Sequence, residues 1–208
     1  MWTISWFCNQ FRPGVEELAK KAGLSIEDWF NKESEDVPAG CEGLLTIHDW
    51  APPADRPYRK GVMFGFDGRH GRAHMYRSLL EGIAFTLKNH LDPMVDELGI
   101  KLEKIIVSGG GAKSEVFLQI FADCFGVPVH RNKMTDAAAI GSAICAGVAT
   151  GLFEDQKAGV AVMVKPRDVY NPNTENNKMY NRLISDVYRT ASESFDGPLE
   201  KLGRIVDE

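Results

Sequence analysis

A run of three glycines between an apolar segment and a helix start carries the clearest chemical signal in the sequence. The apolar segment Ile105–Val107 precedes Gly109–Gly111, and Ala112–Ser114 opens a predicted helix. Glycines let the backbone turn sharply and approach a ligand with no Cβ in the way. The first N–H groups of a helix are unpaired and lie at the positive end of its dipole. This succession of strand, glycine turn and helix start favours a phosphate or nucleotide contact.

The spacing of the glycines differs from the two common nucleotide-binding motifs. Lys113 and Ser114 follow Gly111 with too little loop for G-x-x-x-x-G-K-[ST], and the run does not fit G-x-G-x-x-G. The alternative interpretation is a tight strand-to-helix turn that needs glycine only for packing.

A second polar cluster precedes a long helical pattern. Its members are Asp67, Arg69, His70, Arg72 and His74. One hypothesis places an arginine of this cluster near a phosphate, and the other assigns helix capping to the aspartate and a solvated surface to the rest. Within the helical pattern, Glu81 is expected to form an ion pair or a hydrogen bond to a loop.

Composition excludes several classes of protein. The chain has 208 residues, of which 44% are hydrophobic and 25% charged, as in a soluble globular protein. No apolar run approaches the ~20 residues that span a bilayer, and a net charge of −5 is unlike a nucleic-acid-binding protein. We therefore expect neither a membrane nor a nucleic-acid partner. No secretory signal is visible and the four cysteines lack metal spacing, which predicts reduced thiols in a cytoplasmic protein.

Short apolar segments alternate with helical patterns along the chain. We predict strands over residues 2–8, 43–48, 61–66, 104–108 and 126–130, and helices over 15–21, 25–32, 72–98, 114–125, 136–150 and 173–194. Such alternation favours an α/β layered fold with a partly parallel sheet. The small residues of 136–150 indicate close approach to a neighbouring backbone.

Several separated segments resemble the C-terminal lobe of the FGGY carbohydrate kinases. They are KGVMFGFDGRHGRAHMYRSLLEGIAFTLKNHLD, VSGGGAKSEVFLQIFADCFGVPV and TDAAAIGSAICAGVATGLF, and the resemblance covers roughly residues 43–190. It implies an α/β lobe of the actin-like ATPase (ribonuclease H-like) type, with a mixed sheet flanked by helices. Residues 1–42 would then be the entry strand and helices of the lobe, 43–195 the nucleotide-side domain, and 196–208 a frayed tail.

The resemblance also implies an activity, the transfer of the ATP γ-phosphate to a sugar or polyol hydroxyl. In that case Gly110, Gly111 and Ala112 would lie against the adenosine and α-phosphate of ATP, and Ser114 or Glu115 would reach the adenine edge or the ribose. The small residues of TDAAAIGSA would pack behind the glycine turn. The full set of nucleotide-contacting residues implied in this way is Gly109, Gly110, Gly111, Ala112, Lys113, Ser114 and Glu115.

One part of the family machinery has no counterpart in the sequence. The family's catalytic carboxylate and most Mg²⁺ ligands belong to a facing N-terminal lobe, and no matching Asp motif occurs here. We therefore expect no catalytic residue in this chain, weak nucleotide binding and no turnover, and an uncovered face that can drive self-association. The alternatives are a non-catalytic nucleotide-sensing or interaction module, or an acetate kinase-like or ROK-type kinase; the ROK type would show a Cys-rich zinc pattern that is absent.

Overall fold

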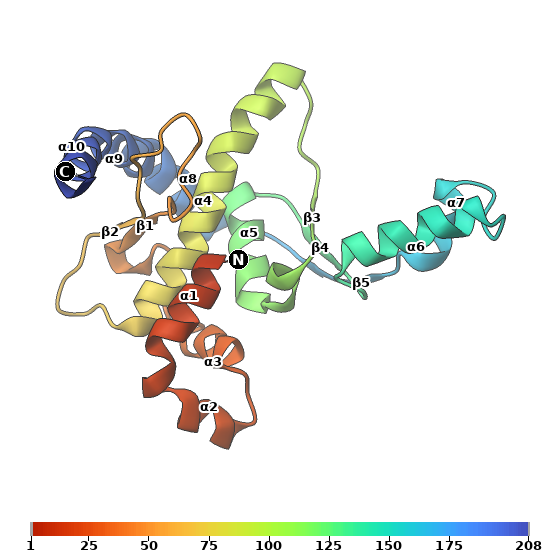
Figure 1. Ribbon diagram of the computed structural model, residues 1–208, viewed down its shortest axis with the longest axis horizontal. Coiled ribbons are helices and arrows are strands. Elements are labelled where there is room, and N and C mark those ends of the chain that lie inside the picture. The colour runs from red at the N-terminus through yellow and green to blue at the C-terminus, as the bar shows by residue number, and fades with distance from the viewer. Residues whose placement is uncertain (1, 208) are drawn as a thin grey trace.

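The computed structural model describes residues 2–207, and one long helix runs through its centre (Figure 1). This helix, α4, spans Arg72–Leu98, as the sequence predicts, and Tyr76, Leu80 and Ala84 on its inner side are buried. Pro93 lies inside the helix without ending it, and the chain leaves at Gly99 with a φ of 61°. Within residues 2–207 no helix combines the length and the apolar character needed to cross a membrane.

In the described residues before the first strand, the regular elements are all helices, joined by turns. They are α1 (Trp2–Phe11), η1 (Arg12–Gly14), α2 (Glu16–Ala22), α3 (Ile26–Glu33) and η2 (Cys41–Gly43). The strand predicted over residues 2–8 is wrong, because Ile4 and Phe7 are buried at helical spacing in α1. The predicted start of α3 is confirmed: the Ser25 hydroxyl accepts a hydrogen bond from the Asp28 N–H at 3.0 Å.

Two small sheets complete the framework. The first pairs β1 (Leu45–Ile47) with β2 (Val62–Phe64) in antiparallel fashion. The second has the order β3 (Ile105–Val107), β4 (Val129–Asn132), β5 (Pro166–Tyr170). Because β4 runs parallel to β3 and antiparallel to β5, this sheet is mixed, as expected. The sequence did not predict β5, where a loop was expected.

The three-stranded sheet has one covered face and one bare face. Helix α5 (Glu115–Phe125) packs against β4 and β5, and Val129 and Arg131 of β4 are buried. The opposite face carries Ile106, His130 and Val169, which lie side by side in the strand register. Ile106 is 55% and Val169 46% exposed, so this face has no second layer over it.

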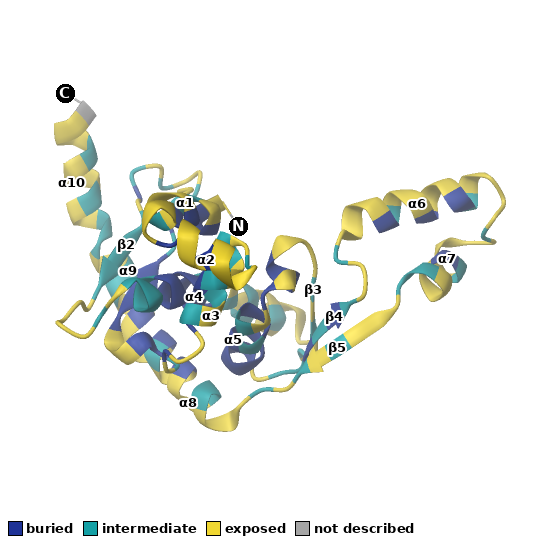
Figure 2. Cartoon of the chain, turned by 90° about the horizontal axis from the view of Figure 1, so that it is seen from below, coloured by how far each residue is buried: buried dark blue, intermediate teal, exposed yellow. Residues whose placement is uncertain are grey.

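Helices α6 (Ala137–Ala149) and α7 (Gln156–Met163) form an arm that extends away from the body and is largely exposed (Figures 1 and 2). The close approach to a backbone expected of the small residues in 136–150 is not seen at its two glycines: a Cβ on Gly141 would meet no atom within 4 Å, and one on Gly147 would meet the Phe153 side chain at 2.5 Å. The expectation that this segment packs behind the glycine turn is wrong for residues 137–139, whose side chains are exposed.

The C-terminal part of the chain returns to α4 as a series of helices. They are α8 (Thr174–Arg182), the π-helical turn η4 (Leu183–Tyr188), α9 (Arg189–Ser194) and α10 (Asp196–Asp207). The helix predicted over 173–194 is therefore confirmed apart from its π-helical turn. Residues 196–207, expected as a frayed tail, form helix α10.

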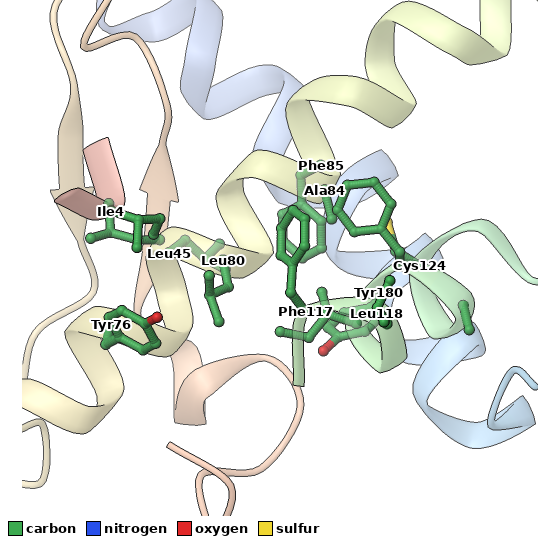
Figure 3. Close-up of a cluster of buried hydrophobic side chains, with 14 of the residues drawn as sticks. Ile4, Leu45, Tyr76, Leu80, Ala84, Phe85, Phe117, Leu118, Cys124 and Tyr180 are labelled. Carbon is green, nitrogen blue, oxygen red and sulfur yellow. The ribbon is translucent and has the colours of Figure 1, made fainter. Parts of the chain in front are cut away.

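The main hydrophobic core lies where α1, β1, α4, α5 and α8 meet (Figure 3). The buried side chains that Figure 3 labels are Ile4, Leu45, Tyr76, Leu80, Ala84, Phe85, Phe117, Leu118, Cys124 and Tyr180. The core thus joins segments from both ends of the chain around α4.

A buried carboxylate fastens three distant segments to one another. Glu81 in α4 accepts hydrogen bonds from the Gly40 N–H at 3.1 Å and 3.2 Å, from Arg77 Nε at 3.0 Å and from the Tyr180 hydroxyl at 2.8 Å. Its side chain is 1% exposed. Every acceptor position that faces the interior therefore has a donor, which confirms both structural roles expected for Glu81, the ion pair and the hydrogen bond to a loop.

Replacing Glu81 by alanine leaves Arg77 buried and unpaired and the Gly40 N–H without an acceptor. We expect the free energy of unfolding to fall by about 3–5 kcal/mol, measured by urea denaturation. Glu97→Ala, on an exposed site of the same helix, is the control and should unfold near the wild-type midpoint. Equal stability of the wild-type chain and Glu81→Ala would show that this hub does not hold the fold.

Candidate functional site

The glycine run forms a sharp backbone elbow between β3 and α5. Gly109 has φ 77° and ψ −157°, a conformation that is accessible almost only to glycine. The following residues, Gly110–Lys113, make one 3₁₀ turn, η3, and α5 begins at Glu115 with Ser114 as its N-cap. The predicted succession of strand, glycine turn and helix start is therefore confirmed.

The elbow is open to solvent at Gly109 and Gly110, whereas Gly111 is buried. A Cβ atom placed on Gly109 or on Gly110 would meet no atom within 4 Å. Within residues 2–207, neither the Gly110 nor the Gly111 N–H donates to another backbone group. Unpaired N–H groups beside a helix N-terminus attract anions through their own partial charges and through the helix dipole. The geometry suits a phosphate.

Three contacts from other parts of the chain fix the elbow. The Gly109 N–H donates to the Thr135 carbonyl at 2.6 Å, just before α6 begins. The Ser114 hydroxyl accepts from the Phe117 N–H at 3.2 Å and donates to Asn31 Oδ1 at 2.8 Å. From below, Arg131 Nη1 donates to the Ala112 carbonyl at 3.2 Å. The turn is therefore exposed at Gly109 and Gly110 and is held by hydrogen bonds to Thr135, Asn31 and Arg131.

The seven residues expected at the site divide between the two sides. Gly109, Gly110, Lys113 and Glu115 are exposed, whereas Gly111, Ala112 and Ser114 are buried. Because the Ser114 hydroxyl already bonds to Asn31 and caps α5, Glu115 is the better placed of the two residues expected near the adenine or ribose. Its side chain is 70% exposed.

Glu115 also borders a hollow of about 530 Å³ beside α4 and α5. Polar side chains in its wall include Arg77, Gln119, Asp123 and Asn176. This hollow could not be predicted from the sequence, because its walls come from segments far apart along the chain.

Three residues that hold the elbow were missed by the sequence analysis. Asn31 and Thr135 carry no local signal, since each acts through one hydrogen bond to a distant segment. Arg131 had a usable signal: in a strand it lies on the same face as Val129. A charged residue on a buried strand face needs partners, and this one has them.

The polar cluster ahead of α4 is engaged in local ion pairs. Asp67 binds Arg69 at 2.6 Å, and the hydrogen bonds from Arg69 lower the pKa of the Asp67 carboxyl to about 2. Arg72 binds Glu33 at 2.6 Å. The N-cap of α4 is Gly71, so the expected capping by Asp67 is wrong. The partly solvated ion pairs fit the surface interpretation.

A second hollow, of about 520 Å³, lies between α4, α9 and the loop after β1. Its buried Arg59 donates to the Ser192 carbonyl at 2.6 Å and pairs with Asp196 at 2.8 Å and Asp49 at 3.4 Å. These contacts join the loop to the C-terminal helices. Among the side chains of the described residues, no group of three or more His, Cys, Asp or Glu could hold a metal ion.

Comparison with known proteins agrees with this geometry. The sequence matches the C-terminal domain of the FGGY family of carbohydrate kinases over residues 3–150. It is 38% identical over 206 residues to an uncharacterized sugar kinase, YgcE, of Escherichia coli (strain K12), covering 99% of this chain and 42% of that protein. It is 28% identical over 192 residues to the xylulose kinase of Bacillus subtilis (strain 168), covering 90% of this chain and 36% of that one.

The fold has solved counterparts as well. The crystal structure of xylulose kinase from Rhodospirillum rubrum superposes with a TM-score of 0.78 at 24% sequence identity, covering 95% of this chain and 38% of that one. This likeness confirms the actin-like α/β fold. The chain spans less than half the length of the relatives it matches, and the elbow falls inside the matched region. The chain therefore belongs to the FGGY family of carbohydrate kinases, which phosphorylate sugars with ATP, and corresponds to the C-terminal domain of that family.

Proposed function

We propose that this chain is the nucleotide-binding lobe of a kinase that transfers the γ-phosphate of ATP to a hydroxyl of a sugar or polyol. The observation that carries the proposal is the open elbow: glycines without neighbours on their outer side, two unpaired amides and the start of α5. Backbone donors of this kind hold a phosphate without a net positive charge in the protein.

The residues present fit a nucleotide in the following way. The α-phosphate lies against the Gly110 and Gly111 amides, and the adenine or ribose lies toward Glu115. Lys113 is exposed beside them and adds a mobile positive charge. Mg²⁺ would be carried by the nucleotide phosphates, and most of its protein ligands would belong to the facing lobe.

Catalysis requires a second lobe. A general base must accept the proton of the sugar hydroxyl, and the phosphoryl group needs donors on its far side. The bare sheet face at Ile106 and Val169, and the exposed α6 arm, are apolar surfaces suited to a covering lobe. That partner is the N-terminal lobe. The match covers 42% of the Escherichia coli relative, so more than half of that protein lies outside the matched part and is long enough to form such a lobe. Self-association is the other way to cover these faces.

Gly110→Leu tests the nucleotide proposal. A Cβ at this position meets no atom within 4 Å, so we expect the fold to be retained while the leucine occupies the space proposed for the phosphate. We expect the affinity for Mg·ADP, measured by calorimetry, to fall at least about ten-fold, a loss of ~1.4 kcal/mol. The matched control is Gly68→Leu, which is equally open but lies in the turn before α4.

Wild-type affinity in Gly110→Leu, with an unchanged melting temperature, would contradict nucleotide binding at the elbow and favour an interaction module. Gly111 is less suitable for this test because it is buried, so a large side chain there also perturbs packing.

The need for a second lobe is tested by turnover. We expect the chain alone to release no ADP above background when ATP, Mg²⁺ and a panel of pentoses and polyols are supplied, because it lacks the base. A coupled assay of ADP release measures this, with a full-length FGGY xylulose kinase as the positive control. Sugar-dependent turnover by this chain would overturn the assignment of the base to a facing lobe.

A further inference from the structure

One charged side chain lies directly beneath the elbow. Arg131 belongs to β4, and its side chain is only 2% exposed. Its Nη1 donates to the Ala112 carbonyl at 3.2 Å, and its Nη2 contacts Glu115 Oε1 at 3.2 Å. The guanidinium thus touches the 3₁₀ turn and the first residue of α5, the two elements that carry the proposed nucleotide contacts.

The same guanidinium is held from the other side by β5. Arg131 Nε donates to Asp168 Oδ1 at 2.7 Å, and Nη2 donates to the second carboxylate oxygen of Asp168 and to the Tyr170 hydroxyl, the latter at 2.8 Å. The hydrogen bonds from Arg131 lower the pKa of the Asp168 carboxyl below its usual range. A lysine could not replace this planar fork, because one ammonium cannot serve groups in so many directions.

The bond to the Ala112 carbonyl constrains the amides around it. A trans peptide is planar, with its C=O and its N–H pointing in opposite directions. When the Ala112 oxygen points toward Arg131, the N–H of the same peptide, which belongs to Lys113, points away from Arg131. The preceding peptides of the 3₁₀ turn share this orientation, because their carbonyls point along the same helical direction.

A contribution to the stability of the fold does not by itself explain a buried arginine at position 131. Burying a guanidinium costs several kcal/mol, and apolar side chains of similar volume are often as stabilising as a buried ion pair. Arg131 makes two hydrogen bonds to the elbow and three to β5, so it links the turn to the sheet, which indicates a different role. We propose that Arg131 is the positioning residue of the nucleotide elbow, orienting its amide groups without touching the nucleotide. This inference rests on the proposed function, nucleotide binding at Gly109–Glu115.

The test removes the charge pair as a unit, so that no lone charge is left buried. In Arg131→Met/Asp168→Asn we expect the circular dichroism spectrum to be retained, the Mg·ADP affinity to fall at least about ten-fold, and amide hydrogen exchange at residues 110–114 to accelerate while α4 stays protected. Arg167→Met is the matched control: Arg167 is exposed and its Nε lies 3.5 Å from Asp168 Oδ2, but none of its ion pairs or hydrogen bonds in the described part of the chain reaches residues 109–115. It should leave affinity and exchange unchanged.

Two readouts keep this inference distinct from the proposed function. If the wild-type chain binds Mg·ADP, unchanged affinity and unchanged elbow exchange in the double variant overturn the positioning role. If the wild-type chain fails to bind Mg·ADP, the proposed function fails, and exchange at residues 110–114 alone decides: local acceleration supports positioning of the turn, and none overturns it. Should the double variant not fold, Arg131→Lys, which keeps the charge beside Asp168, is judged by the same readouts.

Discussion

The glycine turn at Gly109–Gly111 has no side chains to fix its conformation, so hydrogen bonds to its backbone and to the adjoining Ser114 must fix it. In this chain the Gly109 amide bonds to Thr135, the Ala112 carbonyl to Arg131 and the Ser114 hydroxyl to Asn31. Those three partners come from the loop before α6, from β4 and from α3. The open amides therefore depend on the relative placement of three separate elements, and most of the remaining fold maintains that placement.

Helix α4 provides the common reference for these elements. Its buried Glu81 ties the loop at Gly40 and helix α8 to the same point, and Tyr76 donates to the Asn31 oxygen that also receives the Ser114 hydroxyl. A buried group with several hydrogen-bond partners fixes the relative position of the segments that it joins. On the opposite side, the sheet and the α6 arm keep bare apolar faces. The chain thus combines a glycine turn whose backbone is fixed by hydrogen bonds with exposed apolar surfaces that suit a partner lobe.

The sequence predicted correctly those elements whose conformation depends on residues close together along the chain. The Ser25 cap, the periodicity of α4 and the glycine turn all act within a few residues. The strand assigned to residues 2–8 was wrong because a short apolar run is compatible with the residue spacing of a helix as well as with that of a strand. Strand β5 was missed because pairing with β4 creates it, and its exposed residues and Pro166 give a weak pattern. Arg131 was missed because its partner Asp168 lies 37 positions away.

The most direct test is to map Mg·ADP on the chain by amide chemical-shift perturbation, at millimolar nucleotide. If the elbow receives the phosphates, the largest shifts will fall on residues 109–115, with smaller ones around the hollow beside Glu115. Shifts confined to the separate hollow at Arg59, or no shifts at residues 109–115 despite saturation elsewhere, would contradict the assignment of this turn as the nucleotide site.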